Sequence, residues 1–211
     1  MTHTKIVPAV LETDMRSYRS KVAQIRQLTN RFQLDIIDGE FADNKTIQLQ
    51  DIEPPSGLKL DIHLMVARPM EYISNAIKLR PYTVIVQFES ESGVQEAIEK
   101  IKSGGIRSGV AINPDTTVEE IRPLLELVSH VLIMAYPAGF AGQKLQPSVF
   151  KKVAEIRDIN PDIEIGLDGG VDATTLSKIA KAGFDVICTN TYLFEAESVL
   201  TRYHELIGGL S

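Results

Sequence analysis

The stretch QLDIID, residues 33–38, is a short apolar run with a carboxylate in its middle. Successive side chains of a β-strand point to opposite faces, so Gln33, Asp35 and Ile37 share one face while Leu34 and Ile36 share the other. The second face is apolar, as a strand covered by helices requires. We expect the polar face to point inward, which places an acid inside the fold.

Runs of this kind recur roughly every 20 to 30 residues, with amphipathic stretches between them, as βα units require. The runs are 5–11, 33–37, 60–65, 83–88, 108–112, 130–134, 163–167 and 186–189. The alternation predicts a parallel sheet. About eight units in one chain favour a closed (β/α)8 TIM barrel over an open doubly wound sheet, whose first turn would be rich in glycine. Residues 8–12, PAVLE, contain no glycine.

Helix signals between these runs support the same order. An amphipathic pattern extends from Asp14 to about residue 30. Thr116 and Thr117 can each cap the helix that follows them. Asp172 is predicted to cap the next helical stretch, and Gly183 suits the left-handed conformation at its end.

One domain over residues 1–211 is expected, because 44% of the residues are hydrophobic and no linker-like segment divides the chain. The net charge of -6 disfavours nucleic acid as a partner. The single cysteine, Cys188, cannot form an internal disulfide. The first residues lack a signal-peptide pattern and no apolar run is long enough to cross a bilayer. We therefore expect a cytoplasmic protein with a small-molecule partner and no membrane partner.

Several strands send a polar side chain toward one interior. By strand parity Asp61 shares a face with His63 and Gln87 shares one with Glu89, while Asp168 ends its own strand. An isolated strand-end aspartate often only caps a turn, and an isolated histidine is often a core residue. Together with Asp35, however, buried carboxylates beside an imidazole cost several kcal/mol unless they pair or bind a metal. Either answer predicts a functional site, and the reaction we favour there is proton transfer beside a carbonyl group by Asp35 and Asp168, as the resemblance described below implies.

Two glycine-containing segments follow late strands: AGFAGQ at residues 138–143 and DGGV at residues 168–171. Glycine lets backbone N–H groups approach an anion closely, and barrel enzymes often hold phosphate in the loops after their last strands. Either segment alone could be an ordinary glycine turn. Together they predict a phosphate site.

From about residue 6 to residue 194 the chain resembles the ribulose-5-phosphate 3-epimerase family, a group of isomerases of carbohydrate metabolism. The resemblance rests on the order and spacing of PAVLETD (8–14), LDIIDGEFADN (34–44), LDIHLMVARP (60–69), GVAINPDT (109–116), VLIMAYPAGFAGQ (131–143), LDGGV (167–171) and AGFDVICTNTYLF (182–194). It implies a ribulose-phosphate-binding barrel. The implied activity is epimerisation of D-ribulose 5-phosphate and D-xylulose 5-phosphate at carbon 3, through an enediolate.

The resemblance also implies roles for individual residues. Asp35 and Asp168 correspond to the catalytic acid/base pair, and both would bind one divalent metal ion (Zn, Mn, Fe or Co) together with His63. The residues implied to contact substrate or phosphate are Met65, Met134, Gly139, Phe140, Ala141, Gly142, Gly169, Gly170, Asn190 and Thr191. Family members are commonly oligomeric, so assembly as a homo-oligomer is an expectation as well.

The sequence departs from the family pattern at several of these positions. Gln33 stands where the family has its remaining metal-binding histidine, and a neutral amide is a poorer ligand than imidazole for zinc-like metals. The expectation is either a weaker three-ligand metal site or a site in which protein donors hold the oxyanion. Other departures are Ala9, Ile37, Gln87, Tyr136–Ala138 and Thr189–Thr191.

These departures leave two alternatives to the pentulose-phosphate epimerase. The chain could act on another ketose phosphate, such as a hexulose phosphate, because pocket changes alter the substrate while the acid/base pair stays intact. It could also be a non-catalytic sugar-phosphate-binding protein with a degenerate metal site. Proton exchange on a panel of ketose phosphates separates all three.

Overall fold

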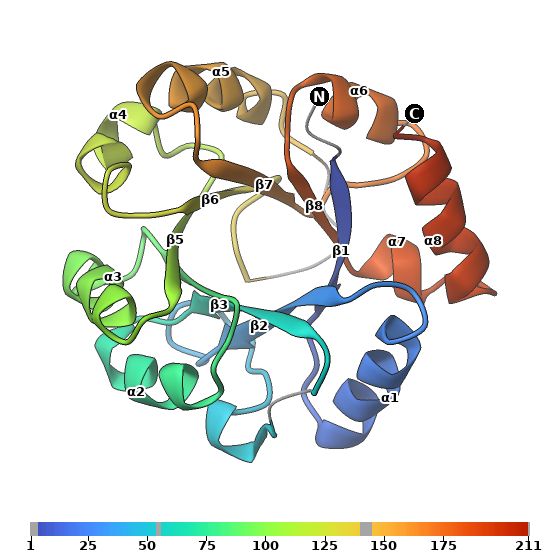
Figure 1. The fold of residues 1–211 in the computed structure, drawn as a ribbon, viewed down its shortest axis with the longest axis horizontal. Coiled ribbons are helices and arrows are strands. Elements are labelled where there is room, and N and C mark those ends of the chain that lie inside the picture. The colour runs from blue at the N-terminus through green and yellow to red at the C-terminus, as the bar shows by residue number, and fades with distance from the viewer. Residues whose placement is uncertain (1–3, 54–55, 140–144, 211) are drawn as a thin grey trace.

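The computed structural model describes residues 4–53, 56–139 and 145–210. Eight parallel strands close into a barrel in chain order, with β8 paired to β1 (Figure 1). The strands are β1 (Lys5–Val10), β2 (Arg31–Ile37), β3 (Lys59–Met65), β4 (Thr83–Gln87), β5 (Arg107–Ile112), β6 (His130–Met134), β7 (Glu164–Asp168) and β8 (Val186–Thr189). The predicted (β/α)8 barrel is confirmed.

Helices surround the barrel, as Figure 1 shows. They are α1 (Met15–Ile25), η1 (Leu49–Asp51), α2 (Met70–Lys78), α3 (Val94–Ser103), α4 (Val118–Ile121), η2 (Arg122–Leu124), α5 (Val149–Ile159), α6 (Leu176–Lys181), α7 (Thr191–Phe194) and α8 (Val199–Gly208). Between β2 and β3, the described residues form a single helical turn, the 3-10 helix η1. In the loop after Asp38, Asn44 donates from Nδ2 to the backbone carbonyl oxygen of Gly139, after β6, at 3.2 Å.

Helix α6 begins later than the sequence predicts. Its N-cap is Thr175, whereas Asp172 lies three residues earlier and uses Oδ1 to accept from the backbone N–H groups of Thr174 and Thr175. Asp172 therefore closes the turn that leads into the helix, because an aspartate bonds its own backbone two residues on as readily as it caps a helix. Gly183 has the predicted positive φ, at 90°.

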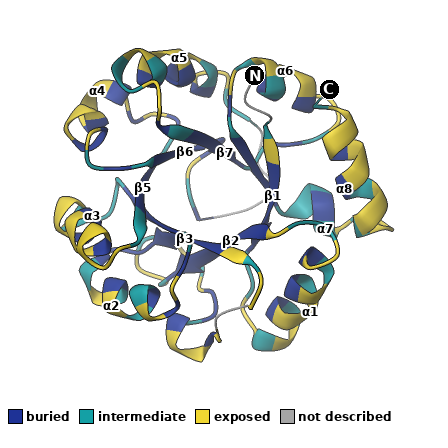
Figure 2. Cartoon of the chain, viewed as in Figure 1, coloured by how far each residue is buried: buried dark blue, intermediate teal, exposed yellow. Residues whose placement is uncertain are grey.

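The strands carry two apolar layers, because alternate side chains point into the barrel and toward the helices. The helix-facing layer includes Leu34 and Ile36. The inner layer contains Val7, Ala9, Ile85, Ala111, Leu132, Met134, Val186 and Cys188. Figure 2 shows the strands largely buried, apart from exposed residues where β1 and β3 begin, and the helices exposed on their outer sides. The predicted inward direction of the polar face of β2 is confirmed, since Gln33 contacts Asp168 and Cys188 across the barrel interior.

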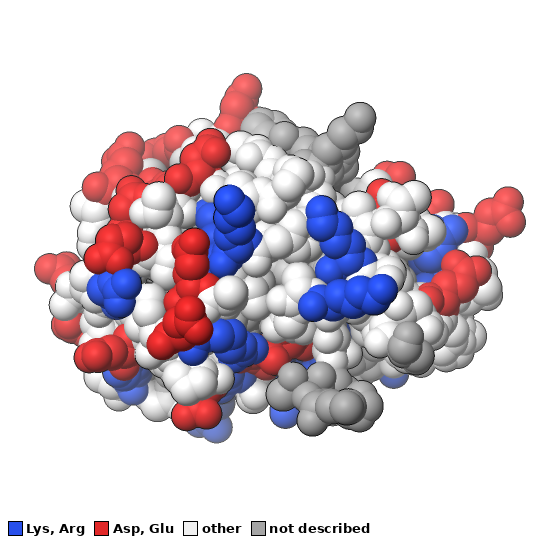
Figure 3. Space-filling model, turned by 90° about the horizontal axis from the view of Figure 1, so that it is seen from above, with Lys and Arg blue, Asp and Glu red and all other residues white. Residues whose placement is uncertain are grey.

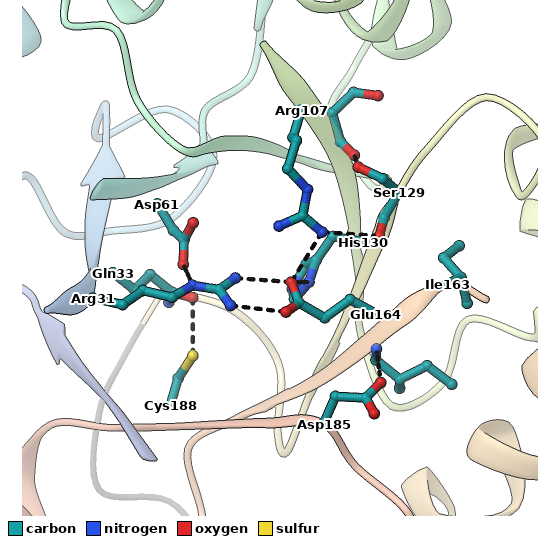
Figure 4. Close-up of polar contacts among 12 residues, drawn as sticks. Arg31, Gln33, Asp61, Arg107, Ser129, His130, Ile163, Glu164, Asp185 and Cys188 are labelled. Carbon is teal, nitrogen blue, oxygen red and sulfur yellow. Dashed lines mark hydrogen bonds and ion pairs between the residues drawn. The ribbon is translucent and has the colours of Figure 1, made fainter. Parts of the chain in front are cut away.

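An ion network closes the N-terminal end of the barrel (Figure 4). Arg31 donates from Nε to Asp61 Oδ2 at 2.6 Å, and its two terminal nitrogens each lie 2.8 Å from an oxygen of Glu164. His130 Nδ1 and Arg107 also contact Glu164, at 2.9 and 3.3 Å. Strand β2 begins at Arg31, two residues before its predicted start, because the backbone already pairs with Lys59 of β3 at that position.

The Glu164 carboxylate links stability to pH. Burial alone would raise the pKa of Glu164, but the hydrogen bonds from Arg31 and His130 lower it well below its usual range. A depressed pKa stabilises the fold above the unfolded-state pKa of about 4.3, and this stabilisation is lost as the pH falls below that value. We expect Glu164→Gln to lose less stability than the wild type between pH 5 and pH 3. Urea unfolding of both proteins across this pH range measures the two losses. An equal loss of unfolding free energy in both proteins would contradict the prediction.

Within the described residues, no helix is both long and apolar enough to cross a bilayer. On the face in Figure 3, basic side chains lie singly or in small groups among acidic and uncharged residues. No continuous basic surface is visible over the described part of that face.

Candidate active site

Three strands bring two carboxylates and an imidazole together at one end of the barrel interior. His63 Nδ1, on β3, lies 3.3 Å from Asp35 Oδ1 on β2 and 3.7 Å from Asp168 Oδ2 on β7. All three residues are buried, and one ligand atom from each lies within 4.8 Å of the others. The chain therefore carries an Asp–His–Asp group that could hold a metal ion.

Gln33 completes this group from the same strand as Asp35. Its Nε2 donates to Asp35 Oδ1 at 2.8 Å and to Asp168 Oδ2 at 2.6 Å. Its Oε1 accepts from the Cys188 thiol at 3.2 Å (Figure 4). The amide thus turns its nitrogen, and not the oxygen that could bind a metal, toward the two carboxylates.

One buried nitrogen of the group favours a cation. His63 Nδ1 is fully buried and faces the two carboxylates, but among the described residues it makes no hydrogen bond of good geometry. A buried polar atom without a partner is costly unless an ion or a water satisfies it. Two carboxylate oxygens and an imidazole nitrogen are ligands that zinc-like divalent ions take. The residues present therefore fit the metal that the family resemblance implies.

The same proximity alters the protonation of the group. Burial and the neighbouring charge of Asp168 both raise the pKa of Asp35. Burial alone would lower the pKa of His63, but its contacts with Asp168 and Asp35 raise it to about 10. Asp35 and His63 therefore hold protons more firmly than free side chains would.

A cavity of about 730 Å³ opens directly over the two aspartates. The predicted site residues that line it are Asp35, Met65, Met134, Gly139, Asp168, Gly169, Gly170, Asn190 and Thr191. His63 and Gln33 do not line it and lie behind the carboxylates. Phe140, Ala141 and Gly142, also predicted to contact phosphate, lie outside the described residues.

The glycines after β7 are required by geometry. Gly169 and Gly170 have φ angles of 83° and 65°, which residues with a Cβ adopt at a cost. A Cβ on Gly169 would also lie 2.5 Å from the Tyr136 hydroxyl. Tyr136 thus packs against Gly169, a contact that the sequence prediction did not foresee when it noted the departure at this position.

Asn190 is tied to α1 at the other side of the cavity. Its Oδ1 accepts from Lys21 Nζ at 3.1 Å, and the same ammonium group lies 2.6 Å from Glu12 Oε1. Lys21 carried no signal in the sequence, because a lysine on an amphipathic helix normally faces solvent. Glu89 was noted only for sharing a face with Gln87, although it contacts the site through that residue.

Comparison with known proteins identifies the family. Residues 5–194 match the model of the ribulose-phosphate 3-epimerase family. The chain belongs to this family. It is thus an enzyme of the isomerase class, and the predicted family assignment is confirmed. Ribulose-phosphate 3-epimerase family relatives include the cytoplasmic isoform of ribulose-phosphate 3-epimerase from Oryza sativa subsp. japonica, 34% identical over 91% of this chain and 88% of that protein. The ribulose-phosphate 3-epimerase of Helicobacter pylori J99 is 30% identical over 92% of both.

Solved structures agree on the fold of this epimerase-family chain. A 3-hexulose-6-phosphate synthase from Salmonella typhimurium superposes with a TM-score of 0.73 at 14% identity, over 98% of each chain. A tryptophan synthase structure from Mycobacterium tuberculosis gives a TM-score of 0.71 at 15% identity, over 99% of this chain and 91% of that one. At these identities the likeness supports the barrel alone.

Proposed function

We propose that the chain interconverts D-ribulose 5-phosphate and D-xylulose 5-phosphate by inverting carbon 3. The observation that carries the proposal is the meeting of Asp35 and Asp168 under one cavity, from strands that are not neighbours in the barrel. Epimerisation needs a proton acceptor and a proton donor on opposite sides of one carbon atom. Family membership supplies the substrate class.

In this mechanism one aspartate, ionised, removes the proton from carbon 3, which the adjacent carbonyl makes acidic. The other, protonated, returns a proton to the opposite face. The raised pKa of Asp35 suits it to be the protonated member in one direction of the reaction. Met65 and Met134 line the cavity and help to exclude water from the intermediate.

Asp35, His63 and Asp168 would hold a divalent metal ion, and Gln33 would orient the two carboxylates through its Nε2. Such an ion would stabilise the negative charge that develops on the enediolate. The glycine pair after β7 and the residues Asn190 and Thr191 would hold the phosphate. The predicted homo-oligomeric assembly and cytoplasmic location stay predictions.

A solvent-exchange experiment tests the function. The protein is incubated with ribulose 5-phosphate in deuterated water, with added Mn²⁺ or Zn²⁺ or with a chelator, and proton NMR follows carbon 3. Deuterium incorporation with appearance of xylulose 5-phosphate is the expected result. Exchange confined to a hexulose phosphate would contradict the assignment of a pentulose phosphate as the substrate. Thermal stabilisation by the sugar phosphate without exchange would overturn catalysis.

Gln33 gives a prediction about metal affinity. Imidazole is a better ligand than an amide for zinc-like metals, so we expect Gln33→His to bind Zn²⁺ or Mn²⁺ more tightly, about tenfold or more. Calorimetric titration of the metal-free protein measures the affinity. Gln33→Met, which has similar length and no amide, is the matched control and is expected not to gain affinity. Equal affinity of the histidine variant and the wild type would contradict the assignment of this position.

A further inference from the structure

A chain of polar contacts leads from His63 away from the cavity. His63 Nε2 lies 2.9 Å from Gln87 Oε1, and Gln87 Nε2 donates to Glu89 Oε2. His63 and Gln87 are fully buried on the neighbouring strands β3 and β4, and Glu89 follows the end of β4. The contacts thus connect the imidazole, an amide and a carboxylate in series.

The Glu89 carboxylate fixes the donor and acceptor roles along this series of hydrogen bonds. A carboxylate only accepts hydrogen bonds, so the NH₂ end of Gln87 must face Glu89 and its carbonyl must face His63. The carbonyl accepts only, so His63 Nε2 must carry a proton. Nδ1, the other ring nitrogen, is the one that faces Asp35 and Asp168.

Glu89 is itself held firmly. Its Oε1 accepts from the backbone N–H of Asn113 at 2.8 Å and from the Thr116 hydroxyl. The buried Lys152 donates to the backbone carbonyl oxygens of Asn113, at 2.8 Å, and of Thr116. The carboxylate therefore bridges the site to the turn after β5, and rotation of the carboxylate would break contacts on both sides.

We propose that Glu89 is a positioning residue which, through Gln87, keeps a proton on His63 Nε2 and holds the ring with Nδ1 facing the aspartate pair. Histidines that bind metals usually donate their other N–H to a carboxylate or carbonyl group, which fixes the ring and its tautomer. Here an amide extends that arrangement by one residue. The significance of the series for catalysis rests on the proposed function, whereas its effect on the imidazole does not.

Glu89→Gln tests the direction of the series. The N–H of Asn113 fixes the new amide oxygen toward itself, so the new NH₂ group faces Gln87. Gln87 must then turn its own carbonyl toward residue 89 and its NH₂ toward His63. We expect His63 to lose its Nε2 proton and to carry a proton on Nδ1 alone. Nitrogen-15 NMR of the histidine-labelled, metal-free protein reads this directly.

The second readout is metal affinity. Loss of such an outer contact typically costs about ten- to a hundredfold in affinity, and we expect Zn²⁺ binding by Glu89→Gln to fall within that range. Gln87→Met breaks the series without touching Glu89 and is expected to lower Zn²⁺ affinity similarly, which covers the case in which Glu89→Gln fails to fold. Glu91→Gln, the same substitution at an exposed residue two positions on, is the matched control and should change neither readout.

A double variant that exchanges the amide and the carboxylate between positions 87 and 89 gives the decisive outcome. In Gln87→Glu/Glu89→Gln, the carboxylate sits beside His63, accepts from Nε2–H and accepts from the new amide as well. We expect the Nε2 proton and the Zn²⁺ affinity to recover. A merely structural role for Glu89 predicts no recovery. Retention of the Nε2 proton in Glu89→Gln, or failure of the double variant to restore it, would overturn the proposal. If the NMR result holds but no sugar phosphate exchanges, the series stands and the epimerase function does not.

Discussion

Replacing Asp168 with asparagine is expected to abolish net interconversion of the two pentulose phosphates, and so is Asp35→Asn. An asparagine side chain neither accepts nor donates the transferred proton at carbon 3, so inversion needs a group that each variant lacks. Positioned acid/base groups contribute about a hundred- to ten-thousand-fold in rate, and we expect losses of that size. Coupled enzymatic assays in both directions, with matched metal content, measure them.

The two variants should differ in the exchange that they retain. The remaining aspartate still faces one side of the substrate, so it can remove and return the proton on that side without inversion. We therefore expect each variant to exchange carbon 3 with solvent on only one epimer, and the two variants to retain opposite epimers. Asp162→Asn, at an exposed position, is the control for the substitution itself. Equal exchange on both epimers by either variant would contradict a mechanism with two aspartates.

The sequence predicted the barrel and its central residues because both follow from local rules. Strand parity places Asp35 and His63 on inward faces, and in a closed parallel barrel the ends of all strands meet at one mouth. Asp168 ends a strand of the same kind. No tertiary information beyond the strand order is needed to expect these three side chains together.

The contacts that orient those residues could not be predicted in the same way. Gln33 bridges the two aspartates only because its amide turns Nε2 toward them and Oε1 toward Cys188, 155 positions away. Glu89 matters because a turn after the next strand supplies two donors to it. Side-chain rotamers and long-range partners decide both roles, and the periodicity of the sequence predicts neither the rotamers nor the partners. The same holds for Tyr136, whose hydroxyl happens to fill the space beside Gly169.

Arg31 shows most clearly which contacts cannot be predicted from the sequence. A charged residue before an apolar run suggests a solvent-exposed strand start, yet the Arg31 side chain is only 6% exposed. Its partners Asp61 and Glu164 lie 30 and 133 positions away. The network that closes the barrel floor is therefore a property of the closed sheet, in which residues from distant parts of the chain face one another.

Arg31→Met is expected to destabilise the protein by about 3 to 5 kcal/mol, because removal of one partner leaves buried charges without compensation. Burial already raises the pKa of Asp61 although Arg31 opposes that shift, so Asp61 would be left as an unfavourable anion or would take up a proton at a cost. Glu164 keeps His130 and Arg107, which places most of the loss at Asp61. Urea unfolding followed by circular dichroism measures the change.

Two further variants separate the buried network from surface charge. Arg68 contacts Glu40, Glu71 and Glu91, but its side chain is 44% exposed, and exposed pairs contribute about 0 to 1 kcal/mol. Arg68→Met should therefore cost far less than Arg31→Met, although Arg68 also has three charged contacts. Adding Asp61→Asn to Arg31→Met removes the uncompensated charge and should restore part of the loss. A cost below about 1 kcal/mol for Arg31→Met, or no recovery in the double variant, would mean that hydrophobic packing rather than charge compensation holds the barrel floor together.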